Sequence, residues 1–266
     1  MSLNLGLGVG LVAHSPPDGT IFPNDGAVGF DNASVYSKTF TAGTISSSDT
    51  INLGVVYKPV ENDVSYIACG SFPHTSGKST SMKYPFQLQQ RGTEQLRLTA
   101  TGAKTSLQVN PPTIFDAGEF NWFGISGSIT ADLFTWFHYS ATSGMTSGSL
   151  AATTNNGFPF EFLSMVNADV GALRGVTGSF SGYSDADIAQ VFVGLNEVDY
   201  TDAAVRAAVL TGTEYKSFQN LEVGIIAHSG NTTTFPTNNA TLYDTLATTS
   251  VTLTDETGPT PPFTGA

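Results

Sequence analysis

Charged residues are scarce in this chain of 266 residues, where Asp, Glu, Lys and Arg together make up 12%. Helices in soluble proteins usually present a charged face to solvent, so this composition disfavours a helical fold. Gly, Ser and Thr are abundant instead, which is typical of turn-rich β structure. The composition predicts an all-β fold, and the length is compatible with one large β-sandwich as well as with two domains.

Basic residues are the scarcer of the two charged kinds. The chain has 10 Lys and Arg against 22 Asp and Glu, which gives a formal net charge of −12. Such a protein repels a phosphate backbone, and no cluster of Lys and Arg stands out in the sequence to overcome the repulsion. We therefore expect no nucleic-acid partner.

Cysteine and histidine are rare as well. Cys69 is the single cysteine, which excludes a disulfide within the chain and a cysteine-based zinc site, and its flank "SYIACGSF" predicts a buried thiol in a strand. The histidines have no i, i+4 spacing and no serine-nucleophile motif nearby, so the sequence indicates neither a zinc enzyme nor a catalytic triad. They are His14, His74, His138 and His228. His138, in an aromatic strand, is expected to pack rather than to catalyse.

Long hydrophobic runs are missing, so no membrane partner is expected. The N-terminus "MSLNLGLGVGLVAHSPPDG" has no Lys or Arg before its apolar run and is interrupted by glycines, which makes it a poor signal peptide. Its "GLGVG" lacks the G-x-G-x-x-G spacing and a following helix, which excludes a dinucleotide site. We expect a soluble protein that is not exported by the usual route.

Residues 1–27 are predicted to form an extended N-terminal arm. Alternation with small residues places Leu5, Leu7, Val9 and Leu11 on one side of an extended chain. Two interpretations are open: a terminal strand of the domain, or an arm that adds to the sheet edge of a partner. At the other end, the Thr/Asn/Pro-rich residues 229–266 predict an extended C-terminal tail that needs a surface to lie on.

Residues 28–228 carry strand signals at short intervals, and these predict the sandwich itself. The clearest hairpin is "YPFQLQQRGTEQLRLTATG". In it Phe86 and Leu88 alternate with glutamines, and Leu96 and Leu98 return after the turn with polar partners between them. One face of this hairpin is therefore expected to be buried and the other wet.

The spacing of hydrophobic residues in the stretch "DIAQVFVGLNEVDYTDAAVRAAVLTG" changes in its middle from that of a strand to that of a helix. It begins as a strand buried on both sides, with Ile188 and Val191 on opposite faces. It continues as one short helix near residues 201–210, with Thr201 as the expected N-cap and Val205 on the apolar stripe. The sequence thus predicts many strands and a single small helix.

Several segments in chain order carry a family resemblance: "FDNASVYSKTF", a strand ending "YKP", the hairpin, "NWFGIS", "DLFTWFHYS", "GSFSGYSDADIAQVFV" and "TDAAVRAAVLTG". Together they resemble the laminin-G-like branch of the concanavalin-A-like jelly rolls, over residues 28–212. The resemblance implies an antiparallel β-sandwich jelly roll. With a Leu/Gly arm, a Thr/Pro tail and no signal peptide, the chain is also similar to decoration, head-fibre and tail proteins of tailed-phage particles.

Two groups of residues are candidates for ligand binding. Trp122, Trp136 and Tyr139 lie on the two aromatic strands and form either a sugar-stacking platform or part of the core. Asp185 and Asp187 could supply oxygen ligands to Ca²⁺ or could be turn residues.

A third group, Glu197, Asp199 and Asp202, is similar to the E-x-D-x-x-E signature of laminarinase-like glycoside hydrolases. Those enzymes need two carboxylates about 5 Å apart on one strand face that lines the cleft. Here the run falls between a strand and a helix, so the preferred interpretation is that these residues solvate a turn and complement the helix N-terminus. No catalytic residue is assigned, and we expect the chain not to be an enzyme.

These observations lead to three hypotheses in order of preference. The first is a non-enzymatic virion structural protein, a capsid decoration (cement) or fibre-type protein that displays a lectin-like sandwich on the surface of a phage particle. Its arm and tail would attach it to the major capsid protein or another virion protein, and we expect a homo-oligomer. The second is a lectin or adhesin module for a surface glycan, with or without Ca²⁺. The third is a laminarinase-like glycoside hydrolase.

Overall fold

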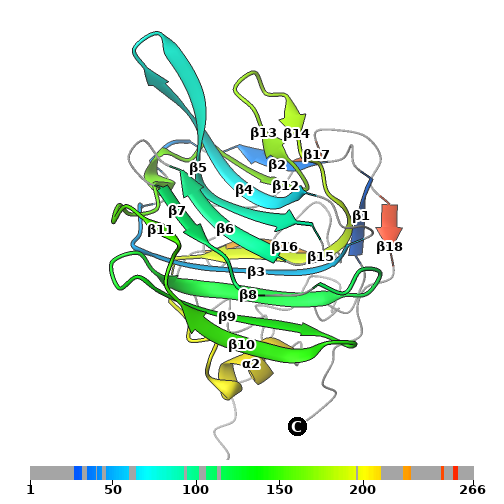
Figure 1. The fold of residues 1–266 in the computed structure, drawn as a ribbon. Helices are drawn as coiled ribbons and strands as arrows, with labels where there is room; N and C mark the ends of the chain where they lie inside the picture. Colours follow the sequence, from blue (N-terminus) through cyan, green and yellow to red (C-terminus); the bar gives the residue numbers. More distant parts are fainter. Residues whose placement is uncertain are drawn as a thin grey trace, which may run out of the picture.

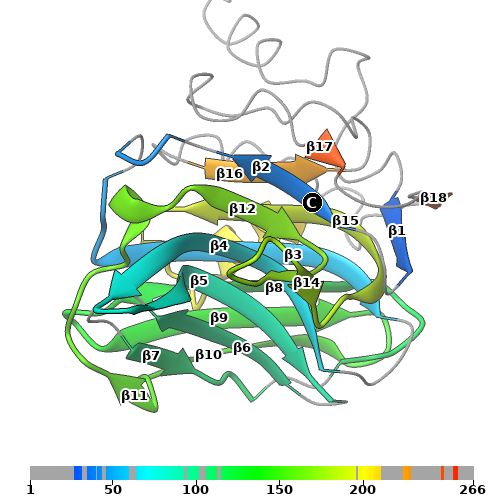
Figure 2. The ribbon, with the colours of Figure 1, turned by 90° about the horizontal axis from the view of Figure 1, so that it is seen from above.

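In a computed structural model of the chain, two antiparallel β-sheets lie face to face (Figures 1 and 2). The structure describes residues 27–210, with short gaps at 32–34, 40, 44–45, 60–63, 93–94, 102–105, 113–114 and 196, and the segments 224–228, 247–248 and 254–256. Every strand pair within these residues is antiparallel. The prediction of an all-β sandwich is confirmed. No helix in the described part is long and apolar enough to cross a membrane.

Sheet A has eight strands and includes the aromatic strands of the sequence. Its order is β10-β9-β8-β3-β15-β1-β18, and β16 also pairs with β15. The strands are β1 (Ala27–Asp31), β3 (Thr50–Pro59), β8 (Asn121–Ser128), β9 (Leu133–Ser140), β10 (Gly144–Leu150), β15 (Asp185–Gly194), β16 (Gly224–His228) and β18 (Thr254–Glu256).

Sheet B also has eight strands, in the order β11-β7-β6-β5-β4-β12-β2-β17. They are β2 (Tyr36–Thr39), β4 (Ser65–Ser76), β5 (Ser79–Arg91), β6 (Gln95–Thr101), β7 (Ser106–Val109), β11 (Thr154–Asn155), β12 (Asn167–Val170) and β17 (Ala247–Thr248). A separate two-stranded ribbon, β13 (Leu173–Arg174) and β14 (Phe180–Ser181), a 3₁₀ turn (Phe162–Ser164) and the helix α2 (Ala203–Leu210) complete the described elements.

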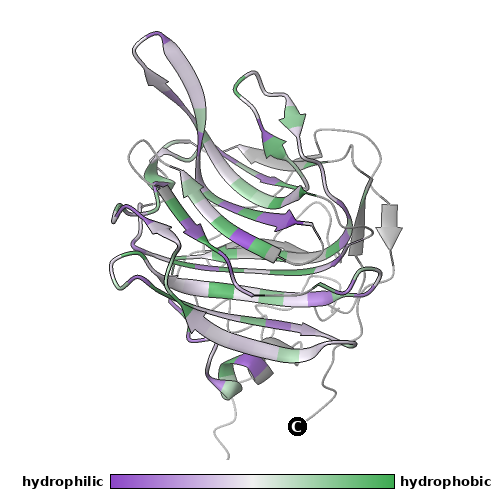
Figure 3. Ribbon diagram, viewed as in Figure 1, coloured by the Kyte–Doolittle hydropathy of each residue, from purple (hydrophilic) through white to green (hydrophobic). Residues whose placement is uncertain are grey.

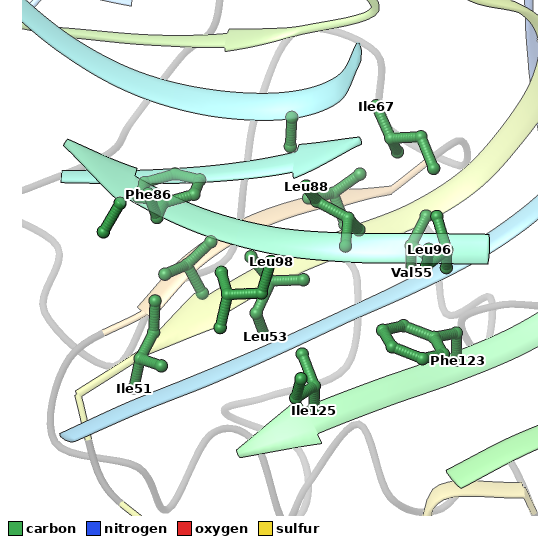
Figure 4. Close-up of a cluster of buried hydrophobic side chains, with 14 of the residues drawn as sticks. Ile51, Leu53, Val55, Ile67, Phe86, Leu88, Leu96, Leu98, Phe123 and Ile125 are labelled. Carbon is green, nitrogen blue, oxygen red and sulfur yellow. The ribbon is translucent and has the colours of Figure 1, made fainter. Parts of the chain in front are cut away.

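The main core fills the space between the two sheets, and strand alternation decides which side chains enter it. From sheet B, Phe86, Leu88 and Leu98 point inward and are at most 1% exposed. They meet Leu53 and Ile125 of sheet A, as Figure 4 shows. The predicted buried face of the β5–β6 hairpin is confirmed.

A bulge breaks the alternation that the sequence predicts for β15. Ile188 and Gln190 pair with consecutive residues of β3, so Ala189 is an extra residue in the strand. An extra residue moves every later side chain to the other face. Ile188 and Val191 therefore both enter the main core, and the prediction that they face opposite ways is wrong.

A second, smaller hydrophobic cluster covers the outer face of sheet A. Its buried members are Val56, Trp122, Phe137 and Tyr200, and Phe120, Tyr139, Met145, Val198 and Val205 pack against them. The chain that leaves β15 supplies Val198, Tyr200 and Val205, so the segment leading to α2 lies across the outer face of the sheet. The strands β3, β8 and β9 of sheet A are consequently covered on both faces.

Tyr200 is the centre of this second cluster. Its ring lies 5.0 Å from that of Phe137, and its hydroxyl donates a 2.6 Å hydrogen bond to Oδ1 of Asn52. The close approach depends on Gly124 of β8, because a Cβ there would lie 2.4 Å from the Phe137 ring and 2.8 Å from that of Tyr200. Glycine at this position lets an aromatic layer rest directly on the backbone of the sheet.

The predicted short helix is confirmed as α2, and it is the one α-helix in the described part of the chain. Its N-cap is Asp202, whose Oδ1 accepts a 2.7 Å hydrogen bond from the backbone N–H of Ala204. The prediction of Thr201 as the cap is wrong, because the Thr201 hydroxyl donates to Asp199 instead. Val205 packs on the second cluster, as its place on the apolar stripe predicted.

The β4–β5 hairpin extends beyond the body of the sandwich (Figure 1). Its tip is polar and exposed, from Thr75 to Thr80, and the hydroxyls of these two residues lie 3.2 Å apart. The base of the same hairpin forms the middle of sheet B.

Two fully buried tyrosines provide a matched test of the Tyr200 hydrogen bond. Tyr200→Phe removes the hydroxyl that bonds Asn52, and we expect the free energy of unfolding to fall by about 1–3 kcal/mol because a buried acceptor loses its partner. The control is Tyr57→Phe: the Tyr57 hydroxyl is equally buried but has no hydrogen-bond partner among the described residues. Its removal should leave stability unchanged or slightly raised. Urea denaturation measures the free energy of unfolding of both variants. An equal loss of stability in the two would contradict a stabilising Tyr200–Asn52 hydrogen bond.

Candidate functional site

Glu197, Asp199 and Asp202 lie in the loop between β15 and α2, and two of these three carboxylates accept hydrogen bonds from backbone N–H groups. Oδ1 of Asp199 accepts hydrogen bonds from the N–H and hydroxyl of Thr201, at 2.8 and 2.6 Å, and these bonds lower the pKa of Asp199. Asp202 caps α2. Glu197 is exposed, and with Asp199 it lines an open hollow of about 420 Å³ at the edge of sheet A. Leu133, Thr135, Ser149 and Thr201 line the rest.

This loop position does not match the geometry of a laminarinase-like pair, which needs its carboxylates on one face of a strand. Asp199 instead stabilises the turn and Asp202 caps the helix, as the preferred interpretation of the sequence had it.

The three candidate sugar-stacking aromatics are not brought together. Trp122 and Tyr139 meet edge to face, with ring centroids 5.7 Å apart, in the second cluster on the outer face of sheet A. Trp136 points the other way, into the main core. Both tryptophans are only 6% exposed, so they pack in the two layers rather than forming a common platform.

Asp185 and Asp187 lie on β15 and point away from the main core, which takes Ala186 and Ile188. Asp187 forms an ion pair with Lys58, with 2.6 Å between Oδ2 and Nζ. Within the described residues there is no group of three or more Asp, Glu, His or Cys side chains that could hold a metal ion. The Ca²⁺ hypothesis therefore stays a prediction that rests on these two aspartates.

His138 belongs to a buried polar network at the end of β9. Its Nε2 lies 2.9 Å from Oδ1 of Asn121, and its ring meets Phe115 edge to face. The Asn121 amide donates to two backbone carbonyls, so Asn121 Oδ1 is the acceptor and His138 Nε2 the donor. Burial lowers the pKa of His138 to about 4, although nearby Asp116 acts in the opposite sense. The predicted packing role of His138 is confirmed.

Asp116 is the charged member of this network. Burial opposes its ionisation, but hydrogen bonds from Ser140 and Ser143 outweigh that effect and lower the pKa of Asp116. The network thus combines an ionised aspartate with a neutral imidazole at neutral pH, and it ties the β9–β10 turn to the segment before β8.

The outer face of sheet B carries an organised set of polar side chains. In one row across the sheet, Tyr66 of β4 pairs with Gln89 of β5, which pairs with Arg97 of β6. In the next row, Gln87 pairs with Thr99, and the Thr99 hydroxyl donates a 2.7 Å hydrogen bond to Oε1 of Gln87. We call these five residues the polar face of sheet B. Figure 3 shows hydrophilic and hydrophobic positions alternating along β6 and β7.

The polar face is already ordered by its own contacts. Gln87 and Gln89 are only 8% and 9% exposed, although they point away from the main core. Nε of Arg97 donates a 2.9 Å hydrogen bond to Oδ1 of Asn110. Amides and hydroxyls both donate and accept hydrogen bonds, and tyrosine adds an apolar ring, so this set can bind a ligand rich in hydroxyl groups.

The loop that carries β13 and β14 closes one side of the polar face. Its base is fixed by a bidentate ion pair in which Arg174 donates to the fully buried Asp169 at 2.6 and 2.9 Å. The Tyr84 hydroxyl donates to the carbonyl of Arg174, and burial raises the pKa of Tyr84 to about 12. Farther along, Gly182 lies against the Tyr66 ring, where a Cβ would come within 2.7 Å.

Cys69 lies beneath this loop as the buried strand thiol that the sequence predicted. Its Sγ donates to the carbonyl of Ala172, and burial raises its pKa far above the ordinary value. The thiol is therefore an unreactive packing group.

Sequence reasoning missed the polar face, although part of its signal was present. The alternation of glutamines with Phe86 and Leu88 predicted one wet face for this hairpin. The sequence could not show that Tyr66 lies beside Gln89, because a bulge in β4 sets that register. The predicted arm residues Leu5, Leu7, Val9 and Leu11 lie outside the described residues.

Part of the expected C-terminal tail is described. Ala247–Thr248 pairs with β2, and Thr254–Glu256 pairs with β1. These two segments therefore lie at edges of the chain's own sheets.

The fold is similar to several solved structures. The heptameric SAP-like pentraxin of Limulus polyphemus matches with a TM-score of 0.55 at 9% identity, over 92% of this chain and 100% of that one. The LG1-3 region of the laminin alpha2 chain has a TM-score of 0.46 at 8% identity, over 67% of this chain and 33% of that one. Tailspike protein 2 of an Escherichia coli O157:H7 bacteriophage has a TM-score of 0.36 at 14% identity, over 72% of this chain and 28% of that one.

No protein-family model matches the sequence, and no curated protein matches it significantly. At this level of identity the pentraxin likeness shows the fold alone. The chain has a concanavalin-A-like, laminin-G-like jelly roll, and that part of the resemblance is confirmed.

The lowered pKa of His138 predicts a pH dependence of stability. In the unfolded chain His138 takes up a proton near its ordinary pKa of 6.5, whereas in the fold it does so only near 4. The unfolded state therefore binds more protons between these values, and the free energy of unfolding should fall by about 3 kcal/mol as the pH drops through this window. His138→Gln keeps a donor for Asn121 but does not titrate. Urea denaturation at pH 7 and pH 4 should show a smaller loss in this variant, and an equal loss would contradict the buried neutral imidazole.

Proposed function

We propose that this chain is a non-enzymatic structural protein of a virion, a decoration or fibre-type protein, whose lectin-like sandwich binds a surface glycan through the polar face of sheet B. One observation carries the glycan part. Within the described residues, strands β3, β8 and β9 of sheet A are covered on both faces, whereas β4, β5 and β6 of sheet B present amide, hydroxyl and guanidinium groups on their outer face.

The proposed absence of catalysis is supported by the use of the acidic residues. Asp199 and Asp202 hold the turn and the helix start, and Glu197 alone remains without such a role in the run. Glycoside hydrolysis needs a proton donor and a second carboxylate at a defined separation across the bond. Glu197 and Asp199 line the hollow at sheet A together, but Asp199 is committed to Thr201.

The proposed location on a virion is supported by the sequence. The sequence resembles tailed-phage decoration and fibre proteins in its composition, its apolar N-terminal arm and its Thr/Pro-rich tail. In this proposal the arm attaches the protein to the major capsid protein or another virion protein, and several copies assemble around a symmetry axis.

A glycan array probed with the full chain tests the binding function. We expect binding to at least one glycan class and no release of reducing sugar from the bound ligands, with and without Ca²⁺. Gln89→Leu keeps the volume of a nearly buried side chain but removes the amide that would hydrogen-bond the glycan, and we expect it to weaken binding at least tenfold. Glu197→Gln is the control on sheet A and should bind normally. Loss of binding in Glu197→Gln, or sugar release that this variant abolishes, would place the site in the hollow instead.

Quantitative mass spectrometry of density-purified particles tests the location. We expect this chain at a simple fraction of the copy number of the most abundant shell protein if it decorates a capsid, or at a few copies per particle if it forms a fibre. Its absence from particles would overturn the virion proposal and leave the glycan-binding proposal to be judged on the array.

A further inference from the structure

The charges of this acidic protein are segregated by sheet. Five of the ten Lys and Arg residues occur within residues 64–115, which contain Glu94 as their single acidic residue. These five are Lys78, Lys83, Arg91, Arg97 and Lys104. Spread over 52 positions, they form no cluster in the sequence, but the segment folds into β4, β5, β6 and β7, which are neighbours in sheet B. Sheet B is therefore locally basic in a chain whose net charge is −12.

Two arginines of this set lie together at the polar face. Arg91 follows Gln89 by two residues on β5, so both point to the same side of the sheet. Arg97 pairs with Gln89 across β6, and Arg91 pairs with Gln95. Arg91 and Arg97 are thus diagonal neighbours on one face, within reach of each other's long side chains.

Neither guanidinium is neutralised within the described part of the chain. The ion pairs there join Lys58 to Asp187 and Arg174 to Asp169. The described side-chain partner of Arg97 is the neutral amide of Asn110. Partial burial and the charge of Arg91 both lower the pKa of Arg97, because each of them disfavours its charged form. Two like charges are therefore held side by side, at a cost that a bound anion would remove.

The surroundings of the pair select the kind of anion. Guanidinium groups match the planar, two-oxygen geometry of a carboxylate. Beside them, Gln89 and the phenol of Tyr66 offer hydrogen bonds and one apolar ring, which suit a sugar ring with its hydroxyls. A nucleic acid would need a longer basic track against the repulsion of the acidic remainder of the protein.

We infer that Arg91 and Arg97 bind the carboxylate of an acidic sugar on the polar face of sheet B, with Gln89 and Tyr66 contacting the same sugar. This inference rests on the proposed glycan-binding function and narrows its ligand to sugars that carry a carboxylate. The loop of β13 and β14, held by the Asp169–Arg174 ion pair, borders the site at Tyr66.

The test uses matched pairs of glycans with the full chain. Oligogalacturonate, a hyaluronan fragment and sialyllactose are each compared with a form whose carboxylate has been converted to a neutral methyl ester. We expect at least one acidic member to bind at least tenfold more tightly than its ester. Arg97→Gln and Arg91→Gln should each remove most of that difference while leaving the weak binding of the ester unchanged.

Lys78→Gln supplies the matched control, because it removes the same charge from the exposed tip of the β4–β5 hairpin. We expect it to bind the acidic glycans normally, and circular dichroism melting should show all three variants folded. An equal loss in Lys78→Gln, or equal binding of a single-stranded oligonucleotide, would show diffuse attraction to a basic surface and overturn the site. Binding of neutral glycans alone would overturn the carboxylate inference but keep the proposed function, whereas binding of no glycan would overturn both.

Discussion

The structure depends on the way in which the strands β3, β8 and β9 of sheet A are covered on both faces. One face meets sheet B through the main core, and the other is covered by the chain that leaves β15 and places Tyr200 against Gly124. Because the hydroxyl of Tyr200 bonds Asn52 in β3, the covering segment is fixed to the sheet by a polar contact as well as by packing.

Within the described residues no hydrophobic cluster covers the outer face of sheet B, and its composition differs accordingly. Inward positions of β5 and β6 include Phe86, Leu88, Leu96 and Leu98, whereas Gln87, Gln89, Arg97 and Thr99 point outward. The near burial of Gln87 and Gln89 means that these amides lose little conformational freedom when a ligand binds. A rigid, hydrogen-bonding surface with a locally positive charge is a suitable platform for a glycan in a protein that otherwise repels anions.

Local sequence signals predicted the features that depend on neighbours in the chain. Strand alternation located the β5–β6 hairpin and its buried face, and the change of period after β15 located α2. Errors arose where one residue alters the pattern. The bulge at Ala189 reversed the faces of β15, and Asp202 took the cap from Thr201 because the Thr201 hydroxyl bonds Asp199.

The candidate site was less accessible to sequence reasoning, because its members come from three strands. The pairing of Tyr66, Gln89 and Arg97 is set by strand register, which depends on bulges in β4 and β5 that no local pattern marks. The aromatic strand β9 shows a related limit. Trp136 and Tyr139 are three residues apart, so strand alternation places them on opposite faces. Only the structure shows that each of them lies in a hydrophobic layer rather than on a common platform.

The projecting β4–β5 hairpin has a consequence for the energetics of local opening. Its tip lies outside both hydrophobic layers, whereas its base is locked into the middle of sheet B (Figure 1). Amide protons between Thr75 and Thr80 should therefore exchange with solvent through fraying of the ribbon, without unfolding of the sandwich. A tip that opens independently of the core can also accept inserted sequence, which makes it the natural place to attach a reporter group without disturbing the polar face.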